Sequence, residues 1–413
     1  MYIFCYIIIF NLFLFVHAYD QNNGAIDIDQ ENFRFYQKRD IYKNPTTNWT
    51  YTIKYYIDGN LSPSKIKSVV RFLMDETCLK FEESHSRETK VPQIEYIYSS
   101  TCLADIGKLV SGKNNRVQLT YQCSTSFGTT GHETLHALGV GHEHQRGDRD
   151  SYVKINRNNI QSGYEENFNK HDTYKWLTFE IPYDYASIMH YRKNSLGKYG
   201  RNTLEAKNIE PFNNMMGHES VFSFNDIKLV NYYYCRNECS FPTIVCKNGG
   251  YVRDPKCNVC VCPKEFGGRD CSNVKDRSYS CNLQTLYAFE GLKQIYSVGK
   301  KRCIFHIKSH SGKRISLFIN LVITMEKETC VSDVGLDIKY LKDKGVTGLC
   351  LCGKYEKIKI YSESSDVLVT YTGLEDGHMF YADYKEISLN DDIKSVLCYN
   401  DKCYKNNELV TDT

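Results

Sequence analysis

Hydrophobic and polar positions in the first large segment of the chain follow both helical and strand periodicities. Within residues 62–83, apolar side chains recur three and four positions apart: Ile66, Val69, Val70, Leu73 and Met74. This spacing predicts a helix, with Ser62 as its N-cap and Pro63 in its first turn. Residues 51–57 and 93–98 have the pattern of strands. A helix mixed with strands predicts an α+β domain.

The pattern becomes strictly alternating further along the chain. In residues 314–324 apolar side chains occupy every second position, which predicts a strand with one buried face. Similar short runs follow at 336–341, 357–361 and 366–371, separated by turn residues. Short strands without helices predict a β-sandwich over residues 281–388.

Length and composition limit the classes of protein to which the chain could belong. Its 413 residues suggest two or three domains, and 41% hydrophobic with 24% charged residues is enough for packed cores. The formal net charge is only +3, so composition gives no support for nucleic-acid binding.

The N-terminal segment has the pattern of an exported protein. Residues 2–16 are almost entirely apolar and small Ala18 follows, which predicts a signal peptide over 1–18. The alternative is an uncleaved membrane anchor, but the run is shorter than the ~20 residues of a typical span. No later segment is long and apolar enough to span a bilayer. We therefore expect a secreted, extracellular protein without a stable membrane anchor.

The 18 cysteines agree with an oxidising compartment. Cys5 would leave with the signal peptide, so 18 − 1 = 17 would remain, an odd number. Six of them fall within residues 239–271, a segment too short to bury a sufficient core without disulfides. Sequons at Asn48 and Asn60 are candidate glycosylation sites, the second weakened by Pro63.

Residues 132–142 contain a metal-binding pattern. His132 and His136 are four residues apart, so on a helix both imidazoles lie on one face. Gly139 can end the helix and let the chain return His142 as a third ligand. Three histidines leave a tetrahedral zinc with one open position, and Glu133 would lie beside it as general base and acid.

The same helix needs an N-cap, and either Thr129 or Thr130 can supply it. The alternative to a metal site is a helix with two surface histidines. A chance match to H-E-x-x-H alone is on the order of a few per cent, and the third His with its Gly lowers it by a further factor of about 10³.

Two motifs together resemble the astacin family of metzincin proteases. Residues 132–150 read HETLHALGVGHEHQRGDRD and fill every specified position of HExxHxxGxxHExxRxDRD. Residues 187–191 read SIMHY, similar to the family's Met-turn. The resemblance implies a catalytic domain over 40–235, with a mixed sheet and a zinc-binding active-site helix.

The resemblance also implies the roles of individual residues. One Zn²⁺ per chain would be held by the three histidines, with Glu133 as general base. Met189 would lie beneath the zinc as a packing floor. Tyr191 would ligate zinc in the resting enzyme and donate to the oxyanion during the reaction, both of which a phenol can do. His190 is expected to pack in the core and not to bind metal.

A second set of implied roles concerns activation. The polar segment 19–39 ends in Lys38-Arg39 and would be a propeptide cut after Arg39 by a trypsin-like protease. The new N-terminus at Asp40 would then be buried near Glu143. Asp27 is a candidate latency ligand of the zinc, although the Phe and Gly of the family's propeptide motif are absent; the alternative is a solvated acidic stretch.

The cysteines of the catalytic segment are implied to pair as Cys78–Cys235 and Cys102–Cys123. Residues 236–272 resemble an EGF-like module, which implies the pairs Cys239–Cys257, Cys246–Cys260 and Cys262–Cys271. A cysteine zinc site is the less favoured alternative there.

Residues 281–388 resemble a CUB domain, with Cys281 and Cys303 as its first pair. Either Cys350 or Cys352 is expected to form a disulfide with Cys330. The other would be a buried free thiol or form an intermolecular disulfide. Cys398 and Cys403 are expected to pair in a tail over 389–413.

These expectations describe a secreted zinc metalloendopeptidase made as a zymogen. Its partners would be an activating protease and protein or peptide substrates, with extracellular matrix among the candidates. The alternative is a matrix-binding or adhesion protein that uses a protease fold as a scaffold. The intact set of Glu133 and three histidines favours the enzyme. The sequence determines neither the substrate nor the oligomeric state.

Overall fold

The computed structural model covers the greater part of the chain. It describes residues 41–43, 48–87, 91–110, 112–235, 239, 244–253, 256–276, 278, 281, 283–388 and 395–410. The predicted signal peptide, the propeptide, Asp27, Arg39 and Asp40 lie outside these ranges. Within them, no helix has the length and apolar character needed to cross a membrane.

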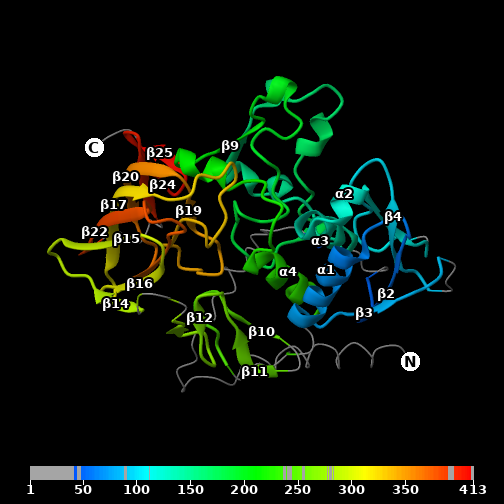
Figure 1. The fold of residues 1–413 in the computed structure, drawn as a ribbon, viewed down its shortest axis with the longest axis horizontal. Helices are drawn as coiled ribbons and strands as arrows, with labels where there is room; N and C mark the ends of the chain where they lie inside the picture. The colour runs from blue at the N-terminus through cyan, green and yellow to red at the C-terminus, as the bar shows by residue number, and fades with distance from the viewer. Residues whose placement is uncertain are drawn as a thin grey trace, which may run out of the picture. The chain divides into compact units, whose positions relative to one another are not determined.

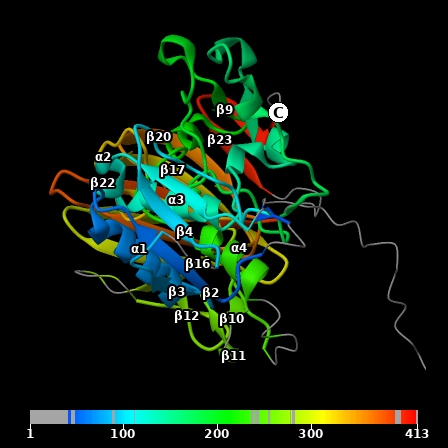
Figure 2. The same ribbon diagram turned by 90° about the vertical axis from the view of Figure 1, so that its right-hand side faces the viewer.

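The N-terminal half of the catalytic segment is a five-stranded sheet covered by helices (Figures 1 and 2). Its elements are β2 (Thr52–Ile57), α1 (Pro63–Glu76), β3 (Lys80–Glu83), β4 (Ile94–Tyr98), β5 (Leu103–Ala104), β6 (Asn115–Leu119), α2 (Tyr121–Ser124) and α3 (Phe127–Ala137). The strand order is β3-β2-β4-β6-β5, with only the edge strand β5 antiparallel. The predicted mixed sheet and the α+β class are confirmed.

The helix that begins at Ser62 is shorter than the periodic segment predicted. Helix α1 ends at Glu76, and residues Lys80–Glu83 form β3 instead of further helix. Cys78 lies between the two, where its disulfide holds the chain. Ser62 is at the N-cap, but its side chain makes no capping hydrogen bond. Its position is thus as predicted, whereas its capping interaction is not formed.

The second half of the catalytic segment is mostly loops and short 3-10 helices. It contains two small antiparallel strand pairs: β1 (Ile41–Tyr42) with β8 (Trp176–Leu177), and β7 (Val153–Ile155) with β9 (Leu204–Ala206). The 3-10 helices span Glu143–Gln145, Arg149–Ser151, Arg157–Asn159, Glu165–Phe168, Lys198–Gly200 and Glu210–Asn214. Helix α4 (Phe224–Tyr234) closes the segment and joins the core of the first half through Ile227, Leu229 and Val230.

A small disulfide-rich module follows. It contains the antiparallel pairs β10 (Tyr251–Arg253) with β11 (Lys256–Val261), and β12 (Phe266–Gly267) with β13 (Asn273–Val274). Three disulfides hold it, Cys239–Cys257, Cys246–Cys260 and Cys262–Cys271. Few of its described apolar residues are buried, namely Cys239, Tyr251, Cys260, Phe266 and Cys271, so we infer that the disulfides carry most of the stabilisation.

The C-terminal part is a two-sheet β structure (Figure 1). The first sheet has the order β14-β16-β21-β18-β19 and the second β15-β22-β17-β20-β23-β24-β25. The bounds are β14 Gln284–Tyr287, β15 Lys293–Val298, β16 Arg302–Lys308, β17 Arg314–Ile323, β18 Leu336–Lys339, β19 Leu349–Leu351, β20 Lys354–Tyr361, β21 Asp366–Thr372, β22 Met379–Ile387, β23 Val396–Tyr399, β24 Lys402–Lys405 and β25 Glu408–Val410. Apolar side chains of both sheets form one core, in which Phe305 contacts Phe380. The predicted all-β class of this part is confirmed.

The tail does not stand apart from this sandwich. We expected residues 389–413 to follow the domain as a hairpin, but β23, β24 and β25 continue the second sheet from β20. Leu397 is fully buried, which explains why these strands join the sheet. Cys398 and Cys403 are disulfide-bonded across the β23–β24 turn.

The remaining disulfides show which of Cys350 and Cys352 is bonded to Cys330 and which is left as a thiol. Cys78 is bonded to Cys235, Cys102 to Cys123 and Cys281 to Cys303. Cys330 is bonded to Cys352, and Cys350 is a buried free thiol. Cys350 lies within β19, opposite Asp337 of β18, whereas Cys352 follows the end of that strand and reaches Cys330 there.

Candidate metal centre

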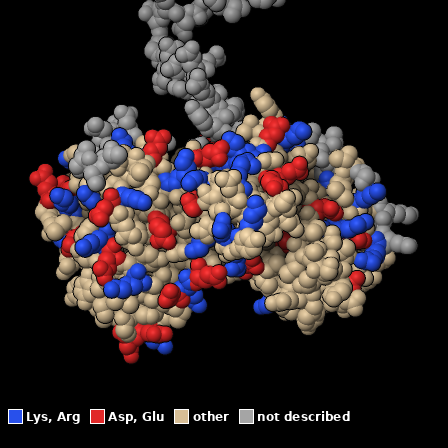
Figure 3. All heavy atoms as spheres, turned by 90° about the horizontal axis from the view of Figure 1, so that it is seen from above, with Lys and Arg blue, Asp and Glu red and all other residues tan. Residues whose placement is uncertain are grey.

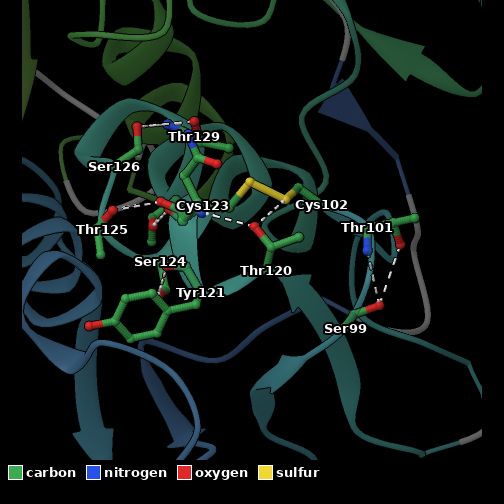
Figure 4. Close-up of a disulfide and its surroundings, with 12 residues drawn as sticks. Ser99, Thr101, Cys102, Thr120, Tyr121, Cys123, Ser124, Thr125, Ser126 and Thr129 are labelled. Carbon is green, nitrogen blue, oxygen red and sulfur yellow. Dashed lines mark hydrogen bonds between the residues drawn. A yellow bond between two sulfur atoms is a disulfide. The ribbon is translucent and has the colours of Figure 1, made fainter.

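Helix α3 presents the first two histidines, and its start is fixed by a cap that sequence reasoning misplaced. The N-cap is Ser126, whose hydroxyl accepts a hydrogen bond from the Thr129 N–H at 3.1 Å, so neither Thr129 nor Thr130 caps the helix. Figure 4 shows this bond beside the Cys102–Cys123 disulfide. That disulfide ties α2, which immediately precedes α3, to the loop after β4. The disulfide and the Ser126 cap together therefore fix the start of α3.

The third histidine is returned to the site by a left-handed turn. Gly139 follows α3 with φ of +96°, a conformation that favours glycine. Its N–H donates to the His136 carbonyl at 2.8 Å, and its carbonyl accepts from the Tyr42 N–H at 2.9 Å. His142 follows three residues later, so the chain doubles back over the helix end.

The three histidines converge as a metal site requires. One ring nitrogen from each of His132, His136 and His142 lies within 4.8 Å of the others. The Nε2 atoms of His136 and His142 are 3.2 Å apart. Two nitrogens bound to a tetrahedral zinc at about 2.1 Å would lie about 3.4 Å apart, so the spacing fits zinc.

The opposite ring nitrogens fix the orientation of the imidazoles. Nδ1 of His132 lies 2.8 Å from the Ile188 carbonyl, and Nδ1 of His136 lies 2.8 Å from the Val140 carbonyl. Nδ1 of His142 lies 3.0 Å from Oε1 of Gln145. An Nδ1–H that donates to each oxygen leaves Nε2 as the free lone pair, the state that a zinc ligand needs. Burial lowers the pKa of all three histidines, which also favours the neutral form.

Glu133 lies within the same helix and is 6% exposed. Burial raises the pKa of its carboxyl to about 8, and the charge of Glu219 adds to the rise. Its Oε2 has no hydrogen-bond partner among the described residues. A buried carboxylate oxygen without a partner is costly unless it meets a cation, water or substrate, so Glu133 fits a role beside a bound metal.

Tyr191 lies against the histidines. Its ring centroid is 4.5 Å from that of His142 and 4.1 Å from that of His144, on which it stacks. Burial, and then the Glu133 charge, raise the pKa of its hydroxyl, while a hydrogen bond with Asn167 opposes the rise. The phenol is thus brought beside the metal site and kept protonated, which suits a hydrogen-bond donor.

The SIMHY segment forms a mostly buried turn, and its Ile188 carbonyl contacts His132. Met189 is 1% exposed, and its carbonyl accepts from the Glu143 N–H at 2.9 Å. His190 lies within 2.6 Å of the Tyr183 hydroxyl through Nε2 and 2.7 Å from the Tyr191 carbonyl through Nδ1. His190 is therefore buried and hydrogen-bonded through both ring nitrogens.

Glu143 is buried in a polar network. Its Oε1 accepts from the Asp184 N–H at 2.8 Å and from Nη1 of Arg146 at 3.2 Å. Arg146 is fully buried and also donates twice to the Asp148 carboxylate, at 2.8 and 2.9 Å. The arginine and aspartate of the sequence motif thus form the scaffold around Glu143.

Two further residues hold the site and were not singled out from the sequence. The Asp226 carboxylate, in the first turn of α4, accepts from the Ser187 hydroxyl at 2.6 Å and from the Ile188 N–H at 3.1 Å. Asp184 begins the turn that leads to Ser187. The signal for Asp226 was present, because Ser223 and Asp226 form a capping box before an apolar run.

The candidate glycosylation residues have different surroundings. The Asn48 side chain accepts from the Tyr233 hydroxyl at 2.5 Å through Oδ1. Asn60 is exposed, and its amide donates to Asp58 within the turn before α1. Figure 3 shows acidic and basic side chains interspersed over the face that it presents, without a continuous basic field.

Comparison with known proteins places these features in a family context. Residues 41–235 match the family model described as Astacin, a peptidase family. Zinc metalloproteinase nas-34 of Caenorhabditis elegans is 31% identical over 352 residues, covering 84% of this chain and 57% of that protein. Zinc metalloproteinase nas-23 of the same organism is 31% identical over 335 residues, covering 78% of this chain and 61% of that protein. The chain thus spans about three fifths of the length of these curated relatives.

A solved structure is also similar to part of the chain. It is high choriolytic enzyme 1, a hatching enzyme zinc-protease from Oryzias latipes (medaka fish). The identity is 32%, the match covers 44% of this chain and 88% of that chain, and the TM-score is 0.40.

Proposed function

Because the chain belongs to the astacin family, we propose that it is a secreted zinc metalloendopeptidase, made as a zymogen, that hydrolyses peptide bonds of extracellular proteins. The observation that carries the proposal is the convergence of three oriented histidine nitrogens, together with the neighbouring Glu133, whose Oε2 has no hydrogen-bond partner among the described residues. His132, His136 and His142 would hold one Zn²⁺. When bound, the ion would supply a Lewis acid for the substrate carbonyl and acidify a water molecule.

The chain's own residues would handle the protons. Glu133 would accept a proton from the water molecule while the water oxygen bonds to the peptide carbonyl carbon. It would then deliver that proton to the amide nitrogen as the C–N bond breaks, so that a free amine and a carboxylic acid result. The Tyr191 hydroxyl, close to His142, would donate a hydrogen bond to the carbonyl oxygen as negative charge develops there.

The sheet edge offers a place for an extended substrate. Strand β5 is the outer strand next to β6, and Leu103 is 44% exposed. An extended peptide could add to this edge through main-chain hydrogen bonds, with side-chain pockets giving selectivity. We propose that the binding region lies beside β5, because this strand packs against α3, the helix that carries His132 and His136.

The proposed activation step has support from the first described residues. Ile41 is fully buried and bridges Val140, while the Tyr42 N–H donates to the Gly139 carbonyl. These bonds hold Ile41 and Tyr42 against the turn leading to His142. Cleavage after Arg39 would free the amine of Asp40, and the buried Glu143 carboxylate is the proposed partner of the resulting ammonium group. Asp27 remains the proposed latency ligand.

The modules after residue 235 would localise the enzyme. Their EGF-like and CUB-like patterns, and the eight disulfides formed in the described chain, support an extracellular setting. Protein or peptide substrates follow from the proposed activity, and extracellular matrix is a candidate source of them.

The test is proteolysis of a broad peptide mixture by the full chain after trypsin treatment. We expect cleavage that is lost on chelation and falls by at least about 10²-fold in Glu133→Gln, because general acid–base catalysis contributes 10²–10⁴-fold. Glu82→Gln is the matched control, since Glu82 is an exposed glutamate of β3 far along the chain from the motif. Equal cleavage by both variants, or none by a zinc-loaded parent whose N-terminus is Asp40, would contradict the proposal. The latter result would favour a binding or adhesion role.

A further inference from the structure

A loop of the C-terminal sandwich approaches the catalytic segment. It comprises residues 341–348, between β18 and β19, and is hereafter called the β18–β19 loop. Asp343 of this loop forms an ion pair with Lys228 of α4, with 3.7 Å between Oδ2 and Nζ. Both side chains are largely buried, at 26% and 7% exposed, so the pair is shielded from solvent.

The sandwich holds this loop rigidly from within. The Lys344 ammonium is fully buried and donates to the Leu341 carbonyl at 2.5 Å and to the Ser364 hydroxyl at 2.8 Å. It also pairs with the Asp366 carboxylate at 3.3 Å. Lys339 donates to the backbone carbonyls of Lys344 and Val346, both at 2.9 Å. A loop bonded at so many points presents its outer side chains in fixed positions.

The loop backbone lies very close to the start of α4. A Cβ added to Gly345 would lie 2.9 Å from Oδ1 of Asn225 and 3.0 Å from the Phe224 ring. Asn225 is fully buried and directly precedes Asp226, which holds the Ser187 hydroxyl and the Ile188 N–H. The loop therefore packs on the helix end that anchors the turn beneath the metal site.

The other outer side chain of the loop reaches that turn directly. The Thr347 hydroxyl donates to Oδ2 of Asp184 at 3.1 Å. The other oxygen of this carboxylate, Oδ1, accepts from the Ala186 N–H at 3.1 Å. The Asp184 carbonyl accepts a hydrogen bond from the Ser187 N–H at 3.0 Å. The Asp184 N–H donates to the Glu143 carboxylate. Thr347 thus helps to fix the rotation of a carboxylate that shapes the turn.

The turn is connected to the metal site by one more hydrogen bond. Ser187 leads directly to Ile188, whose carbonyl lies 2.8 Å from Nδ1 of His132. This carbonyl sets the tautomer and the ring orientation of a metal ligand, as such outer partners generally do. A path of three short steps therefore runs from the sandwich hydroxyl through the turn to His132.

We propose that Thr347 is a positioning residue for the metal site, through which the C-terminal sandwich orders the turn that orients His132. The proposal rests on the proposed zinc site, and it makes the sandwich a structural part of the catalytic centre as well as a binding module. Loss of the Thr347 hydroxyl would remove one of the contacts that fix the rotation of the Asp184 carboxylate. The turn would then loosen, and His132 would be held less well.

The test uses the full chain and three variants. Thr347→Val removes the hydroxyl at nearly constant volume, and Thr347→Ser keeps it. Thr324→Val is the matched control, because Thr324 is a buried threonine of the same sandwich whose hydroxyl donates to the Leu351 carbonyl at 3.2 Å. Zinc affinity is measured by competition with a chromophoric chelator, and kcat and KM with a peptide substrate.

We expect Thr347→Val to weaken zinc binding and lower kcat by about 3–10-fold each, with KM within about twofold of the parent. This is less than the 10–100-fold typical of a direct partner of a metal ligand, because Thr347 acts two hydrogen bonds further away than the Ile188 carbonyl, which contacts His132 directly. Thr347→Ser should restore both values, whereas Thr324→Val should leave both within about twofold. Zinc affinity and kcat of Thr347→Val equal to those of the Thr324→Val control would overturn the proposal.

Two further measurements keep the result decisive. Amide hydrogen exchange over residues 184–190 should rise in Thr347→Val and not in Thr324→Val, which reports on the turn even if the variant is less stable overall. If the parent binds zinc but cleaves no peptide, the proposed activity fails while zinc competition and exchange still decide the role of Thr347. Unchanged amide hydrogen exchange over residues 184–190 in Thr347→Val would also overturn the proposed role of Thr347.

Discussion

The Asp226 carboxylate accepts a hydrogen bond from the Ser187 hydroxyl at 2.6 Å, and its second oxygen accepts from the Ile188 N–H at 3.1 Å. The same second oxygen also accepts from the Ser223 N–H at 2.8 Å, completing the capping box of α4. One buried side chain therefore joins the start of a helix to the turn that carries Met189. The site depends on a residue that lies far along the chain from its histidine ligands.

The first prediction concerns this carboxylate. Asp226→Asn presents a donor where the carboxylate now accepts, so at least one buried N–H or hydroxyl loses its partner. We expect the free energy of unfolding to fall by about 2 kcal/mol, the scale for a buried hydrogen bond to a charged group. Urea unfolding checks it, with Asp75→Asn on the exposed face of α1 as control. Equal midpoints for the two variants would contradict the structural role of Asp226.

The second prediction concerns metal removal. A ligand that binds only the folded state stabilises it by RT ln(1 + [L]/Kd), about 4 kcal/mol at a thousandfold excess over Kd. We therefore expect the Tm of the zinc-loaded chain to fall by several degrees on chelation. In His142→Ala the chelator should change Tm little, since one of the three ligands is gone. A chelator effect of full size in His142→Ala would exclude the three-histidine site.

The third prediction is a pH dependence that arises from Asp337 of β18. Burial raises the pKa of its carboxyl to about 6, opposed by a hydrogen bond with the Cys350 thiol. Because the folded-state pKa lies above the ordinary value of about 4, this carboxyl's contribution to stability is complete below about pH 4 and is lost as pH rises through about 6. This rise in the pKa is worth about 3 kcal/mol of unfolding free energy in full, most of it lost between about pH 4 and pH 7.

The check is the difference in unfolding free energy between the parent and Asp337→Asn, measured from about pH 4 to about pH 7. The asparagine does not titrate. The unfolding free energy of the variant should therefore rise relative to that of the parent by on the order of 2 kcal/mol across this pH range. Other titrating groups, such as Asp366, whose pKa is lowered by His306 and Lys344 against the effect of burial, cancel in the difference. A difference independent of pH would refute the assignment.

The fourth prediction concerns the free thiol. Cys350 is 1% exposed, and burial followed by the nearby Asp337 charge raises its pKa well above its usual range. A buried, protonated thiol reacts slowly, so a thiol reagent should label the native protein hardly at all and label Cys350 after denaturation. The Cys350→Ala variant should lose that label. Rapid labelling of Cys350 in the native protein, or an interchain disulfide to it, would contradict the burial found here.

The sequence predicted the local chemistry of the site well because the chemistry is local. The three histidines and Glu133 fall within 11 residues, and helical geometry with one glycine turn suffices to bring them together. The fold class followed from periodicities of the same kind. These features depend on few long-range contacts, so a pattern in the chain is enough to infer them.

The parts that the sequence did not predict depend on distant residues. Asp184 and Asp226 are ordinary acidic residues until the fold brings Thr347 and Ser187 to them. The cap at Ser126 was missed because neighbouring hydroxyl residues competed for the role, and only backbone geometry selects among them. The tail strands were missed because their burial depends on an open edge at β20.

The Cys78–Cys235 disulfide has a practical consequence for any study of the protein. It joins residues 157 positions apart and encloses the whole metal site between them. A single backbone cut in any loop between the two cysteines would leave both fragments covalently attached. Such a cut would therefore go unnoticed in a non-reducing gel, and the intact mass would rise by only one water molecule. Samples should be compared with and without reductant before any loss of activity is assigned to a substitution.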